Sequence, residues 1–503
     1  MASSAQKQLP MLFLVYVLLL LIFMQEVPHP ASPNSSPLMA VALSKSETRD
    51  EEVKALLKWK SKLDEESRSI LSSWNGSDPC SWQGLGCGPL GSVIGLNLSS
   101  SALRGMLHDL DLSSLPNLVM LKLANNSLLG DIPSSIGNLS KLAYLDLSQN
   151  LLSGDIPTQL GSLRSLKVLD LSSNNITGSV PSSIGSLSNL TGLYLQNNNI
   201  SKFIPREVGM LKSLNDLFLY SNHIGGRIPS SIGNMSSLMR LWLFNNDFIG
   251  SIPIEIGMLV SLSELDLSAN YLNGSIPPTL GNLSNLAFLY FYENQLSGPI
   301  PKEVGGMKSL VHLQLLDNDL TCSIPSSIGN LSNLNILYLF QNKLSGPIPP
   351  EIGNLRSLSE LSIYANNLTG SIPETIGKLG NLTLLFLFGN SIYGPIPPTI
   401  GNLSKLNELH LYQNKLSRSI PKEIGRLRLL VKPALYRNSL EGSLPIEFNN
   451  LTSLTSLQLS DNQFVGQSPR IYAVVKFLRT SLAQNNHFTG PIARSPEKLY
   501  ELV

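Results

Sequence analysis

Apolar residues recur along most of this chain at a fixed interval of 24 residues. In LAYLDLSQNLLSGDIPTQLG, which starts at Leu142, an L-x-L pattern precedes an asparagine, and a glycine and an Ile-Pro pair follow it. Leucines that alternate with outward residues predict a short strand with one buried face in each unit. A single unit has no closed core, so its leucines stay buried only when neighbouring units stack.

The asparagine of each unit is the most regular polar position in the chain. Steps of 24 residues reach an asparagine sixteen times without an insertion, and we call these the ladder asparagines: Asn126, Asn150, Asn174, Asn198, Asn222, Asn246, Asn270, Asn294, Asn318, Asn342, Asn366, Asn390, Asn414, Asn438, Asn462 and Asn486. We expect each amide to turn inward and bond backbone groups that would otherwise stay unpaired, at about 1–3 kcal/mol each. The glycine permits positive φ, and the proline fixes φ and lacks an amide donor.

These roles predict the fold class, an α/β solenoid. We expect a curved array with one parallel β-sheet on the concave face and 3₁₀ or irregular segments on the convex face. Residues 91–493 form about 17 repeats of 24 residues, and Ser101 occupies the asparagine position of a degenerate first repeat. Residues 494–503 are interpreted as a truncated tail, in which no C-terminal cap is visible.

Residues 1–42 are expected to be a signal peptide and a spacer. Lys7 precedes an apolar run of 14 residues, Met11 to Met24, which is short for a membrane span of about 20 residues. Cleavage after Ala42 fits the sequence, although the segment before it does not fix the position of cleavage. The alternative is an uncleaved membrane anchor. Export to the secretory pathway is the preferred interpretation.

Residues 43–90 are expected to cap the first repeat, because solenoid ends must be covered. The segment DEEVKALLKWKSKL has the apolar spacing of an amphipathic helix. Cys80 and Cys87 follow it, close to Trp74 and Trp82. In an exported chain this pair predicts a local disulfide, whereas two reduced thiols would require a cytosolic location.

Composition argues against several functional classes. The formal net charge is +1 and charged residues make up only 14%, so nothing indicates a nucleic-acid or acidic-membrane surface. The six histidines lack metal-ligand spacing, and neither a Walker sequence nor a kinase signature occurs. We therefore expect no catalytic residues, no cofactor and no metal.

Aromatic residues concentrate at the positions four and two residues before the ladder asparagines, which face outward from the concave strands. Between the Asn198 and Asn438 repeats, 14 of these 22 positions are aromatic, out of 33 aromatics in the chain. Together with one histidine they form the candidate ligand-binding set, which we call the concave stripe: Tyr194, Phe218, Tyr220, Trp242, Phe244, Tyr290, Tyr292, Tyr338, Phe340, Tyr364, Phe386, Phe388, His410, Tyr412 and Tyr436. Exposed aromatic surface of this extent is typical of a binding site.

A simpler interpretation is that aromatic residues suit strands and stack between neighbouring repeats. The stripe has a gap in the Asn270 repeat, where Asp266 and Ser268 replace the rings. We favour binding, because a large apolar surface without a partner is a liability. The aspartate of each LDLS segment is interpreted as repeat consensus and not as a catalytic carboxylate.

Asn-x-Ser/Thr sequons are dense, and none falls on the concave stripe. The glycosylation candidates are Asn75, Asn138, Asn189, Asn234, Asn282, Asn330, Asn381, Asn402 and Asn450. N-linked glycans on the convex face and the flanks would leave the concave face free. Cys322 replaces the repeat glycine and is interpreted as a tolerated substitution; an intermolecular disulfide is the alternative.

The GxIPxxIGNLxxL segments of these repeats resemble the plant-specific leucine-rich repeat, and ALLKWKSKL…LSSWNGSDPCSWQGLGC resembles the plant N-terminal leucine-rich repeat cap. Together, residues 48 to 493 resemble the ectodomain of leucine-rich repeat receptor-like kinases of flowering plants. The resemblance implies secreted peptide ligands, a co-receptor that docks near the C-terminal repeats, and a following transmembrane helix and Ser/Thr kinase. The sequence itself shows no such helix, no kinase and no C-terminal cysteine pair.

The sequence therefore predicts an extracellular recognition module that binds a secreted peptide or a partner ectodomain on its concave face. It would act in the apoplast, or at the outer face of the plasma membrane if a transmembrane helix follows. One alternative is a free secreted inhibitor of cell-wall-degrading enzymes. Another is a truncated, non-signalling receptor product.

Overall fold

The computed structural model describes residues 38–467 and 480–489, and the chain forms two units, residues 1–48 and residues 49–503. The cap and the repeats belong to the second unit. The apolar run of the expected signal peptide and the expected tail at 494–503 lie outside the described residues. In the described part, no helix combines the length and apolarity that crossing a bilayer requires.

Two helices open the described chain. Helix α2 (Leu38–Lys62) begins before the expected cap boundary at residue 43, and α3 (Glu65–Ile70) follows it. The Asp64 side chain caps α3 by accepting a hydrogen bond from the amide of Ser67. Three short 3₁₀ helices follow in the cap and the first repeat: η2 (Pro79–Ser81), η3 (Leu107–Asp109) and η4 (Leu112–Ser114).

The predicted disulfide is present, joining Cys80 to Cys87. Beside it, Trp74 stacks on Trp82 with ring centroids 5.6 Å apart, and Trp59 lies 6.1 Å from Trp74. All three indoles are at most 2% exposed. The cap therefore covers the first repeat with an aromatic core and a covalent closure.

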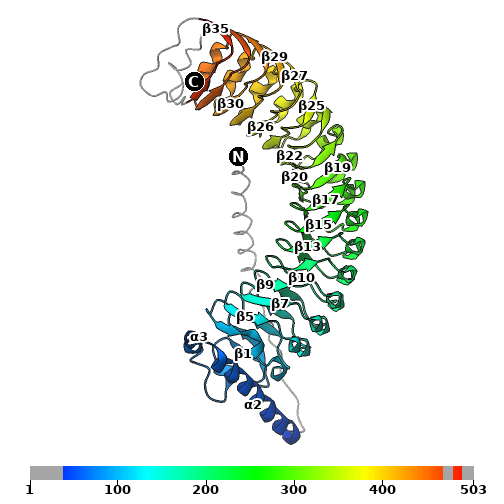
Figure 1. The fold of residues 1–503 in the computed structure, drawn as a ribbon, viewed down its shortest axis with the longest axis vertical. Helices are drawn as coiled ribbons and strands as arrows, with labels where there is room; N and C mark the ends of the chain where they lie inside the picture. The colour runs from blue at the N-terminus through cyan, green and yellow to red at the C-terminus, as the bar shows by residue number, and fades with distance from the viewer. Residues whose placement is uncertain (1–37, 468–479, 490–503) are drawn as a thin grey trace. The chain divides into compact units, whose positions relative to one another are not determined.

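One parallel sheet lines the inner side of the repeat unit (Figure 1). Its first strand, β1, pairs antiparallel with β2, and every later neighbour is parallel. Partner residues are 24 positions apart from β4 onward, as in Gly192 opposite Asp216. The strands are β1 (Leu85–Cys87), β2 (Val93–Asn97), β4 (Met120–Lys122), β6 (Tyr144–Asp146), β8 (Val168–Asp170), β10 (Gly192–Tyr194), β12 (Asp216–Phe218), β14 (Arg240–Trp242), β16 (Glu264–Asp266), β18 (Phe288–Tyr290), β20 (His312–Gln314), β22 (Ile336–Tyr338), β24 (Glu360–Ser362), β26 (Leu384–Phe386), β28 (Glu408–His410), β30 (Lys432–Ala434), β32 (Ser456–Gln458) and β34 (Thr480–Leu482).

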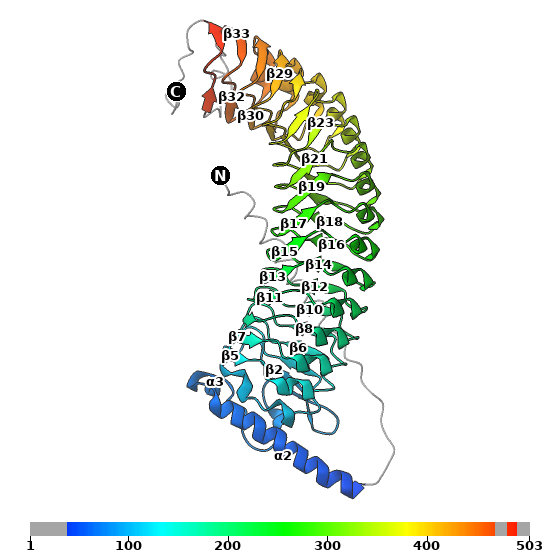
Figure 2. The same ribbon diagram turned by 45° about the vertical axis from the view of Figure 1, so that its right-hand side comes forward.

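A second series of short strands was not predicted. These strands follow the ladder asparagines and form four parallel sheets, visible beside the main sheet in Figure 2. They are β3 (Arg104–Met106), β5 (Ser127–Asp131), β7 (Leu151–Asp155), β9 (Asn175–Thr177), β11 (Ser201–Lys202), β13 (His223–Gly226), β15 (Asp247–Gly250), β17 (Tyr271–Gly274), β19 (Gln295–Pro299), β21 (Asp319–Thr321), β23 (Ser345–Pro347), β25 (Asn367–Thr369), β27 (Tyr393–Gly394), β29 (Lys415–Arg418), β31 (Ser439–Gly442), β33 (Gln463–Gln467) and β35 (His487–Thr489).

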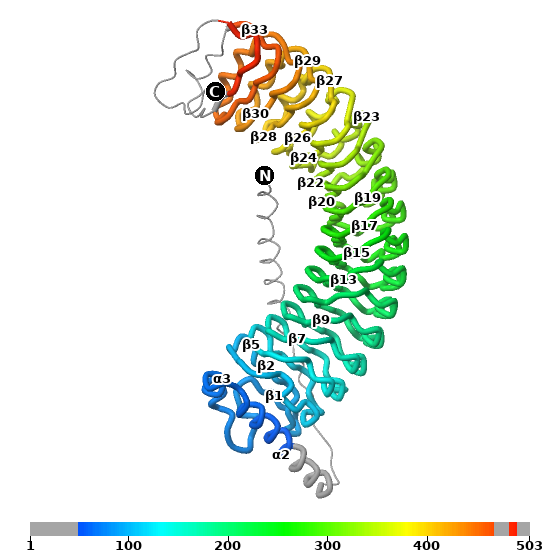
Figure 3. The backbone as a smooth tube through the Cα atoms, in the orientation of Figure 1, coloured from blue at the N-terminus to red at the C-terminus, as the bar shows by residue number. Residues whose placement is uncertain are grey.

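The convex side consists of 3₁₀ helices, as the sequence predicts (Figure 3). Each starts directly after the repeat proline, whose fixed φ near −68° suits a helix entry, as at Pro133. These helices are η5 (Ser134–Asn138), η6 (Thr158–Ser162), η7 (Ser182–Ser186), η8 (Arg206–Met210), η9 (Ser230–Asn234), η10 (Ile254–Met258), η11 (Pro278–Asn282), η12 (Lys302–Gly306), η13 (Ser326–Asn330), η14 (Pro350–Asn354), η15 (Glu374–Lys378), η16 (Pro398–Asn402), η17 (Lys422–Arg426) and η18 (Ile446–Asn450).

The ladder asparagines bond backbone groups as expected. The Nδ2 of Asn246 donates to the carbonyls of Leu219 at 3.0 Å and Leu243 at 3.2 Å, and its Oδ1 accepts from the amide of Ile224 at 3.0 Å. The carbonyl of Leu219 also accepts from Asn222. Two successive asparagines therefore share a carbonyl, which links each repeat to the next.

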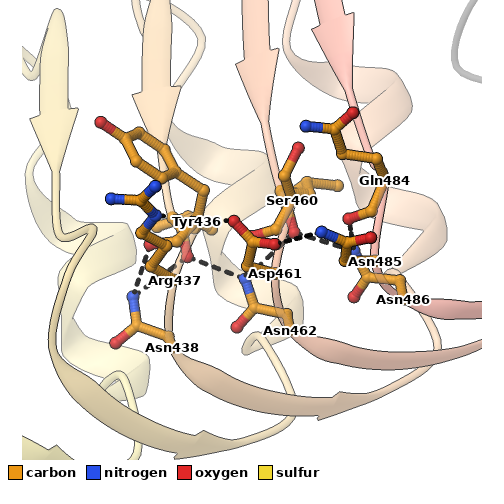
Figure 4. A network of polar contacts seen from close by, with 11 residues as sticks. Tyr436, Arg437, Asn438, Ser460, Asp461, Asn462, Gln484, Asn485 and Asn486 are labelled. Carbon is orange, nitrogen blue, oxygen red and sulfur yellow. Dashed lines mark hydrogen bonds and ion pairs between the residues drawn. The ribbon is translucent and has the colours of Figure 1, made fainter. Parts of the chain in front are cut away.

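The same pattern reaches the last described repeats. Figure 4 shows Asn438, Asn462 and Asn486, with Asp461 of the intervening turn. The carboxylate of Asp461 lies 3.6 Å from Arg437 and accepts a hydrogen bond of 2.6 Å from Asn485. The hydrogen-bonded turns of the described residues thus extend to Asn486.

The repeat glycine has positive φ, from 72° to 90° at twelve positions such as Gly250, because left-handed backbone favours a residue without Cβ. Lys202, Cys322 and Arg418 occupy the same position with φ of 69°, 63° and 68°. The repeat backbone imposes this conformation even where the residue disfavours it. Cys322 is a free, exposed thiol.

Candidate functional site

The concave stripe occupies two of the three rows of outward side chains on the inner face. The strand of each repeat contributes outward residues six and four positions before the ladder asparagine, and the residue two positions before it continues the face beyond the strand. All fifteen stripe residues lie on this face. Fourteen are partly buried, and Phe218 is 1% exposed.

The stripe is less exposed than the sequence suggests. No stripe residue is among the large apolar side chains exposed by more than about a third. The reason is ring stacking between repeats, and Phe218 is covered entirely by its neighbours. Phe218 therefore supports the surface from below and offers a ligand no area of its own.

The longest stack contains five rings at the position two residues before the ladder asparagine. Neighbouring centroids lie 4.1 to 4.3 Å apart with interplanar angles of 9° to 14°. We call this the C-terminal ring stack: Phe340, Tyr364, Phe388, Tyr412 and Tyr436. Because each ring face is covered by the neighbouring ring, the stack presents ring edges and phenol hydroxyls to the concave side. Ring edges carry partial positive charge, which favours carbonyl oxygens over cations.

A second group of rings lies toward the N-terminus. Phe218 stacks on Trp242 at 4.1 Å, Tyr220 stacks on Phe244 at 4.3 Å, and Tyr194 meets Phe218 edge to face at 5.2 Å. We call these five residues the N-terminal ring cluster. Burial raises the pKa of Tyr220 to about 12, so its hydroxyl stays a hydrogen-bond donor.

An ion pair borders the N-terminal ring cluster. Arg240 binds Asp216 through two hydrogen bonds, Nε to Oδ1 at 2.6 Å and a terminal nitrogen to Oδ2 at 2.8 Å. Its guanidinium lies 5.3 Å from the Phe218 ring centroid, and the hydroxyl of Tyr194 donates to Asp216 at 2.9 Å. This arrangement fixes a cation against a ring and a carboxylate in a partly buried site.

Polar contacts also orient the middle of the stripe. The hydroxyl of Tyr290 lies 2.9 Å from Nδ1 of His312, and Tyr338 donates to Glu360. His410 stacks on Phe386 at 4.2 Å. Burial, with the nearby charge of Lys432, lowers the pKa of His410 to about 4, so this imidazole is neutral near neutral pH.

The glycosylation candidates are accessible. All nine asparagines are exposed, and six of them end 3₁₀ helices on the convex side: Asn138, Asn234, Asn282, Asn330, Asn402 and Asn450. Asn189 and Asn381 donate to backbone carbonyls of the preceding repeat at 2.8 and 2.9 Å. Occupancy by glycans stays a prediction.

No metal site emerges in the described part of the chain, where no three His, Cys, Asp or Glu side chains could hold an ion together. The buried carboxylates have a structural explanation. Asp266 accepts hydrogen bonds from the amide of Ser268 at 3.0 Å and from its hydroxyl at 2.6 Å, and Asp170 makes the same contacts with Ser172. Burial raises the pKa of each aspartate to about 7, and the charge of Asp146 adds to the effect on Asp170.

Comparison with known proteins defines the class. Family models of the leucine-rich repeat region match residues 95–245, 230–345, 274–391 and 326–474. The model of the leucine-rich repeat N-terminal domain matches residues 49–88, which contain the disulfide. The chain therefore belongs to the leucine-rich repeat proteins.

Its relatives are plant receptors. A segment of 95 residues is 45% identical to MDIS1-interacting receptor like kinase 2 of Arabidopsis thaliana, covering 18% of this chain and 9% of that protein. The crystal structure of a TDR receptor superposes with a TM-score of 0.73 at 36% identity, covering 78% of this chain and 68% of that one. The plant peptide hormone receptor RGFR1 in complex with RGF2 gives 0.68 at 34% identity, covering 81% and 76%. The aligned segment thus spans about a tenth of the curated relative's length.

Proposed function

We propose that this chain is the extracellular recognition region of a protein of the receptor-like kinase type, and that its concave stripe binds a secreted peptide or a partner ectodomain at the cell surface. The observation that carries the proposal is the concentration of rings on one face. Fourteen of 22 outward positions are aromatic, while the convex sequons are exposed.

The ring geometry favours an extended peptide as the ligand. The C-terminal ring stack offers edges and hydroxyls at steps of 4.1 to 4.3 Å, and a peptide advances by about 3.3 Å per residue. Tyr436 can donate a hydrogen bond to a backbone carbonyl of the peptide, whereas the hydroxyl of Tyr364 already donates to Gln341 at 3.4 Å and that of Tyr412 to Tyr436. Burial raises the pKa of Tyr364 and Tyr412, which keeps these two phenols protonated. The complex of RGFR1 with RGF2 supports this class of ligand by similarity.

A co-receptor ectodomain is the second partner that we propose, on the basis of the family resemblance. A following transmembrane helix and kinase would place the region at the outer face of the plasma membrane, and signalling would then depend on them. N-linked glycans would occupy the convex side.

The test selects binders without assuming a ligand. Random dodecapeptides displayed on phage are panned against the protein, and the selected peptides are measured by biolayer interferometry. The double variant Tyr338→Ala/Phe340→Ala changes the stripe, and Ile254→Ala/Met258→Ala changes exposed convex side chains as the matched control. We expect the stripe variant to weaken most binders about tenfold or more, with little effect of the control. The proposal would be contradicted if the binders had the same affinity for the stripe variant as for the unchanged protein. It would also be contradicted if panning yielded no binder that depends on the stripe.

A further inference from the structure

The gap in the concave stripe has ring faces on its border. Trp242 stacks on Phe218 with an interplanar angle of 5°, and Phe244 stacks on Tyr220 with an angle of 9°. Each ring therefore has its β12 side covered, and its opposite face lies toward β16. The three outward positions of the Asn270 repeat carry no aromatic residue, so no ring continues either stack.

Two carboxylates and a serine take the place of the rings. Glu264 and Asp266 lie on the same face of β16, and Ser268 follows them. On the far side, β18 and the turn after it supply Tyr290 and Tyr292. Tyr292 interacts with Ser268, whereas the hydroxyl of Tyr290 turns away to His312. The opening therefore lies in the row that runs from the Trp242 ring over Asp266 to Tyr290.

The opening has the width of one planar group. Neighbouring strands of a sheet are about 4.8 Å apart, so rings two strands apart are separated by about 9.6 Å. The stacked rings of this face are 4.1 to 4.3 Å apart, and each fills one step. One flat group between Trp242 and Tyr290 would extend the stack of Phe218 and Trp242 by one step.

The carboxylates of the opening favour a cation, because pairing with one stabilises the charged form of Asp266, whose pKa burial raises to about 7. Asp266 receives its hydrogen bonds from Ser268 on Oδ1, and within the described residues none reaches Oδ2. Arg240 is committed to Asp216 by two hydrogen bonds. Burial raises the pKa of Glu264, which Arg240 and a hydrogen bond from Trp242 lower in part. Glu264 thus shares the charge of Arg240 with Asp216, whereas Asp266 has no ion-pair partner among the described residues.

The chain already contains the matching arrangement one step away. The guanidinium of Arg240 lies over the Phe218 ring and binds the Asp216 carboxylate through two hydrogen bonds from one of its edges. A planar guanidinium suits this combination better than an ammonium, because it stacks on rings and binds carboxylates with two parallel hydrogen bonds. At Asp266 the carboxylate and the Trp242 face are present, and a guanidinium would complete the set.

We propose that the opening over Asp266 is an arginine site: a ligand arginine inserts its guanidinium between Trp242 and Tyr290 and pairs with Asp266. This inference rests on the proposed function, because the site belongs to the same concave face. It specifies the ligand further. The peptide would carry an arginine over the Asn270 repeat and an apolar or neutral segment over the C-terminal ring stack.

The test uses N-acetyl-arginine amide as the probe, with saturation-transfer NMR on the protein as secreted from insect cells. N-acetyl-lysine amide and N-acetyl-citrulline amide are the chemical controls, since citrulline keeps the shape and lacks the charge. We expect saturable binding of the arginine amide, binding of the lysine amide weaker by about fivefold, and none of the citrulline amide.

Two matched variants locate the site. Asp266→Asn should weaken arginine binding by about tenfold or more, while its thermal unfolding at pH 7 stays cooperative with a midpoint no lower than that of the unchanged protein. Asp170→Asn removes the carboxylate of the equivalent Ser-bonded motif, whose row neighbours are Asp146 and Tyr194, and should leave binding unchanged. Equal binding of the citrulline amide, no binding of the arginine amide, or an equal loss in both variants would overturn the arginine site. Peptides from panning that still require Tyr338 and Phe340 would then leave the proposed function standing.

Discussion

Replacing the ladder asparagine Asn246 with alanine should lower the free energy of unfolding, and the hydrogen bonds that are lost give the size of the effect. The side chain is 6% exposed and bonds groups of its own repeat and of the preceding one. The carbonyl of Leu219 would keep its bond from Asn222, and that of Leu243 its bond from Asn270. Only the amide of Ile224 would lose its acceptor.

An orphaned buried amide costs about 1–3 kcal/mol, and the lost packing of the amide group adds to this. We therefore expect Asn246→Ala to lower the free energy of unfolding by roughly 2–4 kcal/mol. Urea unfolding measures this difference. Hydrogen exchange of the Ile224 amide reports the local effect and should accelerate more than that of amides three repeats away.

The control is Asn354→Ala, an exposed asparagine at the end of η14 that belongs to no sequon. It should change the free energy of unfolding by less than about 0.5 kcal/mol. If Asn246→Ala has an equally small effect, or if Ile224 exchanges as before, the ladder bonds do not hold the repeats together as argued.

Four further outcomes follow from the geometry. Since burial raises the pKa of Asp266 to about 7 from 3.8, the folded state binds this proton more tightly than the unfolded state, and stability from this group is lost as the pH rises between these values. Asp266→Asn should thus leave stability nearly unchanged at about pH 4 and increase it at about pH 8 by at most roughly 4 kcal/mol, and a variant less stable at the higher pH would refute this. Cys80→Ser with Cys87→Ser should lower the unfolding free energy by about 2–4 kcal/mol, with the cap losing near-UV ellipticity first. Asn234→Gln should increase electrophoretic mobility after plant expression by one glycan, and an unchanged band would show an empty site. Phe388→Ala should cost roughly 3–5 kcal/mol in urea unfolding, because its ring stacks on both Tyr neighbours, and a loss below about 1 kcal/mol would mean that the stack contributes little.

Much of the fold was predictable because the repeat has a constant length. The ladder of Asn126 to Asn486, the positive φ of glycines such as Gly250, and the Cys80–Cys87 disulfide all follow from residue types at fixed positions, and the structure confirms them. The second series of strands was missed. Its residues alternate too briefly to indicate pairing, and its hydrogen bonds form only between neighbouring repeats.

The sequence predicts where the residues of the candidate site lie, but not how accessible their side chains are. The positions of the stripe follow from strand alternation. The burial of Phe218 does not, because it depends on the ring planes of Tyr194 and Trp242 in adjacent repeats. For the same reason the gap at Asp266 is readable in the sequence, while the stacking of Trp242 on Phe218 beside that gap requires the structure.

The spacing of the C-terminal ring stack has a mechanical consequence. Its rings are 4.1 to 4.3 Å apart, closer than the roughly 4.8 Å between strands, as befits the inside of a curve. Straightening this stretch would separate neighbouring rings and weaken their stacking. The C-terminal ring stack therefore opposes flattening of the array. The Asn270 repeat and the Asn318 repeat, which has Gln314 and Leu316 at these positions, lack such a ring, and bending of the repeat unit should concentrate at these two repeats. A ligand side chain that fills the position in the Asn270 repeat would stiffen the inner face there, so ligand binding could change the local curvature.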